Sequence, residues 1–233
     1  MLLALAAAAL LAAPARAGDA PLLEVVSRQV IRPASFIPVT PDAPAVVPLA
    51  LVVQEGSPWQ APGMLEGVLG KASAIFSRCG VTLGAAEVVT ARWSAEGLRR
   101  LNVNDPYKGP EQTAVMSEPL IPSRRPVGFL FDKSSVPSTA KAYNKSSVDA
   151  FKRQFPDAGV ILDTFWITID QQVRKPKVDE AASFSVFAHE LTHIFGDLPH
   201  TRLHPNLMTD DESAGAKSGD LTDEQCAAIR HLF

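Results

Sequence analysis

Apolar residues in the first half of the chain are spaced as buried strands and an amphipathic helix require. The continuous, β-branched run Val46–Val53 predicts a buried strand, and apolar positions at helical spacing from Leu65 to Phe76 predict a helix that ends near Gly80. A second apolar run, Val81–Val89, predicts the next strand. The order strand, helix, strand is typical of a parallel crossover unit, so we expect helices packed on a sheet.

The second half continues with shorter elements. Further strands are expected at three apolar runs, Val127–Phe131, Val160–Leu162 and Trp166–Ile169. Two polar segments, Asn102–Pro126 and Ser134–Ser147, are expected to be loops.

Two helices are expected near the C-terminus. The first runs from about Asp179 to Gly196 and has a buried face of phenylalanine, leucine and isoleucine. The second has Thr222 as its N-cap and Gln225 three residues later, which is the spacing of a capping box. Together these elements predict the α/β (α+β) class, with a mixed sheet, a helix after its first strand, a long helix and a C-terminal helix.

The N-terminus has the pattern of an export signal. An unbroken apolar run from Leu2 to Pro14 precedes Ala15-Arg16-Ala17, which is a small-x-small cleavage pattern. A membrane-spanning helix needs roughly 20 apolar residues, and this run is shorter. We therefore expect residues 1–17 to be a signal peptide that is removed, and the mature protein to be secreted or periplasmic with no membrane segment.

The mature chain is expected to be an arm followed by one domain, and a monomer. Residues 18–45 are rich in proline and contain a β-like run at Leu23–Ile31, which is typical of an arm laid along a domain. Residues 46–233 are expected to form a single domain. The 233-residue chain is 46% hydrophobic and 20% charged, which is the balance of a globular protein with a proper core.

Charge and cysteine content narrow the function. With 22 Lys and Arg against 25 Asp and Glu the formal net charge is −3, so no basic excess is present to hold a nucleic acid. Only two cysteines, Cys79 and Cys226, are present, which excludes a disulfide-dense scaffold and a cysteine-rich zinc module. In an exported protein we expect these two residues to form one disulfide.

The segment His189-Glu190-Leu191-Thr192-His193 is an H-E-x-x-H motif inside the strongest helical pattern of the chain. Helix residues four apart lie on one face, so both imidazoles can reach one ion. Glu190 lies beside them and is placed to take a proton from metal-activated water.

A zinc site needs a third protein ligand, and His200 is the natural one. On a continuous helix His200 would lie about 16 Å beyond His189, which is too far to share an ion. Gly196 can adopt the left-handed conformation that ends a helix, and Pro199 cannot extend it. We therefore expect the chain to turn back at Gly196 and bring His200 beneath the metal.

Further on, the segment from His204 to Met208 is expected to form a compact turn with its methionine under the metal site. HELTHIFGDLPH followed by PNLM resembles the metzincin zinc endopeptidases, which carry H-E-x-x-H-x-x-G-x-x-H and a downstream Met-turn. The resemblance covers Phe187 to Met208 and implies a mixed sheet with a long active-site helix. It implies these roles: zinc ligands His189, His193 and His200, general base Glu190, turn residue Gly196 and Met-turn residue Met208.

The sequence departs from the family at one position. His200 is one residue later than the usual third histidine and Pro199 takes the expected place, which we interpret as a bulge in the loop. The spacing from His200 to Met208 matches that of matrixin-like members. No tyrosine follows Met208, so the tyrosine that assists some subfamilies is absent.

Other assignments stay open at this point. His204 or Asp197 could replace His200, and in gluzincins the third ligand is a downstream glutamate, for which Glu212 and Glu224 are available. The peptide around Cys79 also resembles the cysteine switch of matrixin prodomains, although a disulfide is the simpler interpretation.

The predicted function is that of a secreted zinc endopeptidase, with Glu190 as general base and a peptide or protein as substrate. The substrate is expected to lie extended against a sheet edge. The alternative is an exported zinc-binding domain, or an inactive peptidase that acts as a binding domain. Retention of Glu190, which is not a metal ligand, favours catalysis.

Overall fold

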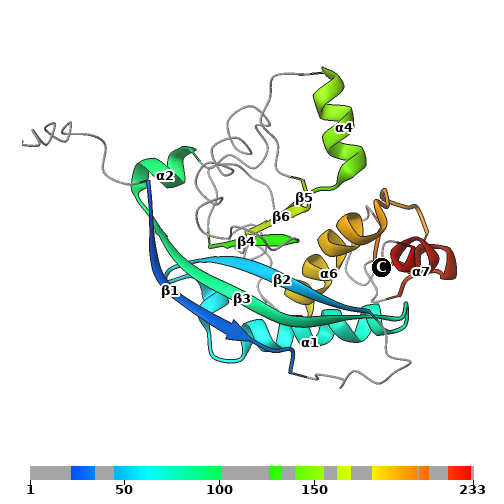
Figure 1. The fold of residues 1–233 in the computed structure, drawn as a ribbon, viewed down its shortest axis with the longest axis horizontal. Helices are drawn as coiled ribbons and strands as arrows, with labels where there is room; N and C mark the ends of the chain where they lie inside the picture. Colours follow the sequence, from blue (N-terminus) through cyan, green and yellow to red (C-terminus); the bar gives the residue numbers. More distant parts are fainter. Residues whose placement is uncertain are drawn as a thin grey trace, which may run out of the picture.

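The computed structural model describes residues 22–34, 45–100, 126–132, 140–154, 162–168, 180–203, 205–209 and 220–231. Within them lie six strands: β1 Leu23–Ile31, β2 Ala45–Gln54, β3 Val81–Trp93, β4 Val127–Phe131, β5 Ala140–Tyr143 and β6 Thr164–Thr168. The helices are α1 Met64–Ser77, α2 Ala95–Arg100, α4 Lys145–Gln154, α6 Glu180–Gly196 and α7 Asp223–Arg230, with a short 3-10 helix at Pro58–Gln60. This is the mixed α/β fold that the sequence predicts (Figure 1).

The six strands form one mixed sheet in the order β1-β3-β2-β4-β6-β5. The four central strands β3, β2, β4 and β6 are parallel, whereas β1 and β5 pair antiparallel with β3 and β6 at the two edges. The central strands are apolar on both faces because both faces of the sheet are covered, as parallel sheets require. The β-like run of the N-terminal arm is the edge strand β1.

Each face of the sheet has its own hydrophobic core. On one face α1 and α6 pack against the sheet and α7 packs on α6, with Phe76 and Phe195 in edge-to-face contact at 5.1 Å. The other face carries an aromatic cluster in which Trp166 stacks on Phe129 at 4.6 Å, with Val148 of α4 beside it. The motif-bearing helix α6 is thus wedged between the sheet, α1 and α7 (Figure 1).

The crossover unit β2–α1–β3 is confirmed. β2 and β3 pair in parallel, and α1 buries the apolar stripe that predicts it, including Leu69 and Phe76. Gly80 has a φ of +74°, so the chain after α1 turns through the left-handed region that glycine tolerates.

The segment Ser134–Ser147 is not a loop throughout, so that prediction is wrong. Residues 140–143 form β5, and α4 begins at Lys145. The helix starts there because Asn144 caps it: the Asn144 Oδ1 accepts from the backbone N–H of Ser147 at 3.2 Å. Residues 133–139 lie outside the described residues.

The other predicted elements agree with the structure only in part. β6 spans Thr164–Thr168 and so begins two residues before the predicted Trp166, while Leu162 lies in a turn and the rest of the Val160–Leu162 run lies outside the described residues. The expected loop Asn102–Pro126 is described only at Pro126. Among the described helices, none is both long and apolar enough to cross a membrane.

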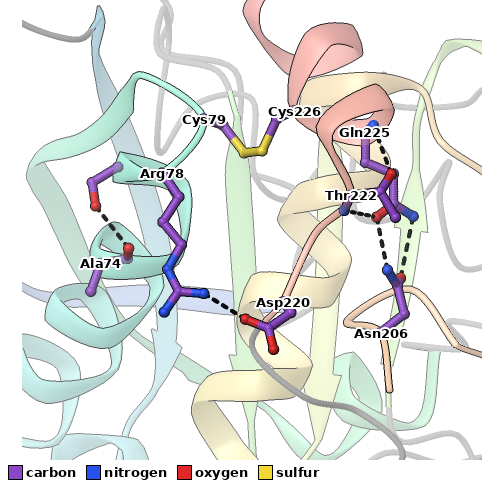
Figure 2. Close-up of a disulfide and its surroundings, with 9 residues drawn as sticks. Ala74, Arg78, Cys79, Asn206, Asp220, Thr222, Gln225 and Cys226 are labelled. Atoms are coloured by element: carbon purple, nitrogen blue, oxygen red, sulfur yellow. Dashed lines mark hydrogen bonds and ion pairs between the residues drawn. A yellow bond between two sulfur atoms is a disulfide. The ribbon is translucent and has the colours of Figure 1, made fainter. Parts of the chain in front are cut away.

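The last helix and the cysteines are as predicted. Thr222 and Gln225 form the capping box of α7, with the Thr222 hydroxyl accepting from the Gln225 N–H at 3.2 Å. Cys79, two residues beyond α1, is bridged to Cys226 of α7 (Figure 2). The bridge therefore fastens α7 to α1.

Candidate metal centre

Helix α6 presents His189 and His193 on one face, one turn apart. The opposite face holds the helix in the core: Phe187 meets Phe165 of β6 edge to face at 5.1 Å, and Leu191 is fully buried. The imidazoles of His189 and His193 lie 4.8 Å apart, measured between ring centres. Their Nε2 atoms are 3.2 Å apart.

His200 completes a cluster of three. Its Nε2 lies 3.1 Å from the Nε2 of His189 and 3.1 Å from that of His193. The three residues together form a group that can hold a metal ion. The structure thus brings together the three histidines that the sequence predicts as ligands, including the one with irregular spacing.

The turn that carries His200 differs from the prediction in one detail. The left-handed residue after α6 is Asp197, with a φ of +49°, and not Gly196. Gly196 is needed for space instead, because a Cβ there would lie 2.7 Å from the side chain of Leu198. Asp197 tolerates the left-handed region because an aspartate side chain can bond locally, and here it accepts hydrogen bonds from the backbone N–H and the hydroxyl of Ser146.

Two main-chain carbonyls orient the helix histidines. The Nδ1 of His189 is 2.7 Å from the Leu207 oxygen, and the Nδ1 of His193 is 2.6 Å from the Leu198 oxygen. A carbonyl can only accept, so both Nδ1 atoms carry a proton, and in the neutral form of each ring the Nε2 atom presents a lone pair.

The cluster fits a cation better than a hydrogen-bond network. Two lone pairs 3.2 Å apart repel each other, and a cation between them turns that repulsion into coordination. Ligand atoms of a tetrahedral zinc ion at about 2.1 Å lie about 3.4 Å from one another. The observed separations of 3.1 to 3.2 Å are close to that requirement.

The segment of residues 206–209 pairs with the chain next to His200. Met208 is fully buried, its carbonyl accepts from the Thr201 N–H at 2.9 Å, and Thr201 forms a β-bridge with Thr209. This pairing holds the chain on either side of the turn close to His200. The predicted place of Met208 under the metal site stays a prediction.

Glu190 and a lysine from β5 complete the surroundings. Glu190 follows His189 on α6 and is 6% exposed. Burial lowers the pKa of Lys141 from its ordinary value of 10.5, and the charge of Glu190 opposes this shift by favouring the ammonium. The Lys141 ammonium also lies 5.4 Å from the centre of the Tyr143 ring. Sequence reasoning missed Lys141, because it placed that residue in a polar loop.

Two of the alternative ligands, Asp197 and Glu224, lie among the described residues, and neither is part of the cluster. Asp197 is engaged with Ser146, and Glu224 lies on the exposed first turn of α7. His204 and Glu212 lie outside the described residues. The thiol that a cysteine switch requires is absent, because Cys79 is in a disulfide.

Comparison with known proteins gives structural similarity only. No family of known proteins matches this sequence, and no curated protein matches it. The fold is similar to archaemetzincin from Methanopyrus kandleri, with 13% identity, a TM-score of 0.47, and coverage of 80% of this chain and 94% of that one. It is also similar to a chain from a structure described as a chaperone-substrate complex, with 12% identity, a TM-score of 0.48 and coverage of 82% of this chain but only 34% of that one.

Proposed function

We propose that this protein is a zinc-dependent endopeptidase of the metzincin kind, with His189, His193 and His200 as ligands. The observation that carries the proposal is the convergence of three Nε2 atoms to within 3.2 Å, with two of the rings held in the ligating tautomer by carbonyl oxygens. A pair of buried structural histidines would need neither the third ring nor that shared tautomer.

Glu190 has the position and chemistry of a general base. When bound, zinc supplies Lewis acidity, which polarises a carbonyl and acidifies water. Glu190 then accepts the proton from the attacking water and returns it to the leaving amine of the peptide. Its place next to His189, on the same helix as two ligands, keeps its carboxylate beside the reaction while the imidazoles hold the ion.

The substrate peptide lies extended along β5. In the described part of the sheet β5 is the last strand, and it pairs with β6 on one side only. An edge strand offers backbone groups to which a peptide can add as a further strand. Because β5 packs next to α6 and carries Lys141, a peptide bound there runs beside the metal centre.

We further propose that residues 1–17 are removed on export and that the mature protein acts outside the cytoplasm. The Cys79–Cys226 disulfide supports this, since such bridges persist in oxidising compartments.

The test combines metal analysis with a cleavage assay. Glu190→Gln should retain one zinc per chain and lower hydrolysis of a peptide library by about 10³-fold or more, because the ligands remain and the proton acceptor does not. Glu224→Gln on the exposed first turn of α7 is the matched control and should retain both zinc and activity.

Three outcomes would contradict the proposal. Near wild-type turnover by Glu190→Gln would remove Glu190 from the mechanism. Stoichiometric zinc without cleavage by the wild-type protein would favour the zinc-binding domain. Loss of zinc in Glu224→Gln would favour a gluzincin ligand set.

A further inference from the structure

The orientation of His189 depends on one main-chain carbonyl. Its Nδ1 lies 2.7 Å from the oxygen of Leu207, a residue that is fully buried. This contact holds His189 in the tautomer whose Nε2 lone pair faces the other two histidines. Whatever fixes the Leu207 carbonyl therefore also fixes a metal ligand.

The turn around Leu207 is held from both sides. The Asn206 Oδ1 accepts from the backbone N–H of Met208 at 2.8 Å, so the Asn206 side chain closes the turn across Leu207. The backbone N–H of Leu207 donates to the carbonyl of Asp220 at 2.9 Å. The direction of the Leu207 carbonyl is set by these contacts.

Asn206 is held in turn by Gln225 of α7. Figure 2 shows the pair: the Asn206 Nδ2 donates to the Gln225 Oε1 at 3.0 Å, and the Gln225 Nε2 donates to the Asn206 Oδ1 at 3.2 Å. The same Oε1 accepts from the backbone N–H of Thr222 at 2.9 Å. Asn206 is 2% exposed, so loss of the pair would leave its buried Nδ2 without the Gln225 acceptor.

Helix α7 is anchored by the disulfide. Cys226 follows Gln225 in the sequence and is bridged to Cys79 beyond the end of α1 (Figure 2). A continuous set of bonds thus leads from the disulfide, through the Gln225 and Asn206 amides, to the carbonyl that orients His189.

We propose that Gln225 and Asn206 are positioning residues for the metal centre, and that they couple the anchoring of α7 to the metal affinity of His189. Gln225 has two roles that can be separated: it caps α7 through Thr222, and it holds the turn through Asn206. The inference rests on the proposed function only for the identity of the ion.

The experiment compares two variants that both weaken the cap. Gln225→Ala loses the Oε1 that accepts from the Thr222 N–H, which is one half of the cap, and it loses the amide pair. Thr222→Ala loses the other half, the hydroxyl acceptor of the Gln225 N–H, and keeps the amide pair. Zinc affinity is measured by competition with a chelator at a temperature where circular dichroism shows both variants folded. Gln225→Ala should bind zinc about 10- to 100-fold more weakly than the wild type, and Thr222→Ala should stay within about threefold.

A conservative variant keeps the test decisive if Gln225→Ala does not fold. Gln225→Glu keeps the acceptor for Thr222 and for the Asn206 Nδ2 and replaces the donor to the Asn206 Oδ1 by a carboxylate oxygen, which can only accept. Its zinc affinity should lie between those of the wild type and Gln225→Ala. Equal affinity losses in Thr222→Ala and the Gln225 variants, or none in the latter, would overturn the proposal.

A readout without metal separates this inference from the proposed function. In metal-free protein the Nδ1–H resonance of His189 should be protected from exchange in the wild type and in Thr222→Ala, and lost in the Gln225 variants. If the four proteins show this pattern of protection but the wild type binds no zinc, the proposed function is refuted and the positioning role is supported. An unprotected resonance in the folded wild type would refute the positioning role itself.

Discussion

Replacing both cysteines of the Cys79–Cys226 disulfide by alanine should lower the free energy of unfolding by about 3–5 kcal/mol at 25 °C. The bridge joins residues 147 positions apart, so the closed loop contains α6, with His189 and His193, and the turn that carries His200. In the chain-entropy account, closing a loop of that length lowers the entropy of the unfolded chain by about 17 cal/mol/K. This corresponds to a stabilisation of about 5 kcal/mol at 25 °C. The measured stabilisation by a disulfide is usually somewhat smaller than this estimate, so the expected range begins at about 3 kcal/mol.

The assay must separate the cross-link from the packing of its sulfur atoms. Cys79 is fully buried and Cys226 is 6% exposed, so alanine at both positions also leaves small voids. Wild-type protein reduced with dithiothreitol is the matched control, because it loses the bond and keeps both sulfur atoms. Urea unfolding at 25 °C is followed by circular dichroism in the presence of EDTA, so that bound metal adds no stability.

Most of the loss in the free energy of unfolding should appear both in the reduced wild type and in the double alanine variant. A loss below about 1 kcal/mol in reduced wild type would refute the loop-entropy reasoning, since the unfolded chain would then gain little freedom from cleavage of the bridge. A large loss confined to the alanine variant would assign the stabilisation to packing of sulfur in the core.

Three further predictions concern the site. His200→Ala should weaken zinc binding at least about 100-fold in chelator competition, whereas His231→Ala, at the exposed end of α7, should stay within about threefold. Asp197→Ala should cost about 1–2 kcal/mol in urea unfolding, because it strains a left-handed residue and removes both acceptors of Ser146, and Asp197→Asn should recover most of that loss. Lys141→Met should raise Tm at pH 7: burial lowers the pKa of Lys141 in the folded state, so its charge opposes folding at neutral pH. That gain in Tm should shrink as the pH approaches 10.5, where the lysine of the unfolded chain also loses its proton, and a lower Tm at pH 7 would contradict the reasoning.

Local periodicity explains which elements the sequence predicts. β2, α1 and β3 are long and bury continuous or regularly spaced apolar residues, so their pattern is complete within each segment. The helix α4 buries little more than Val148, and its N-terminus is fixed by Asn144 and by Asp197 from a distant part of the chain. A pattern with one buried position carries no period, which is why this region was expected to be a loop.

The site likewise contains features that the sequence predicts and features that only the fold determines. The spacing of His189 and His193 is a property of one helix and is visible in the sequence, and the turn to His200 could be inferred from residues that end helices. The choice between Gly196 and Asp197 as the left-handed residue depends on the close approach of Leu198, which only the fold shows. Partners of the imidazoles were also missed, since they are backbone carbonyls and have no sequence signature.

The choice of carbonyls as partners has a chemical consequence. A carboxylate bonded to the Nδ1 of a ligand histidine adds negative charge and makes that ligand more basic, whereas the carbonyls of Leu207 and Leu198 fix the tautomer without adding charge. An ion held by three neutral rings keeps more of its positive charge for acidifying water. Retention of zinc then depends on where the carbonyls point and not on the charge of Glu190. For this reason we expect Glu190→Gln to keep its zinc at full occupancy, and Gln225→Ala, which leaves every ligand and charge in place, to bind it more weakly.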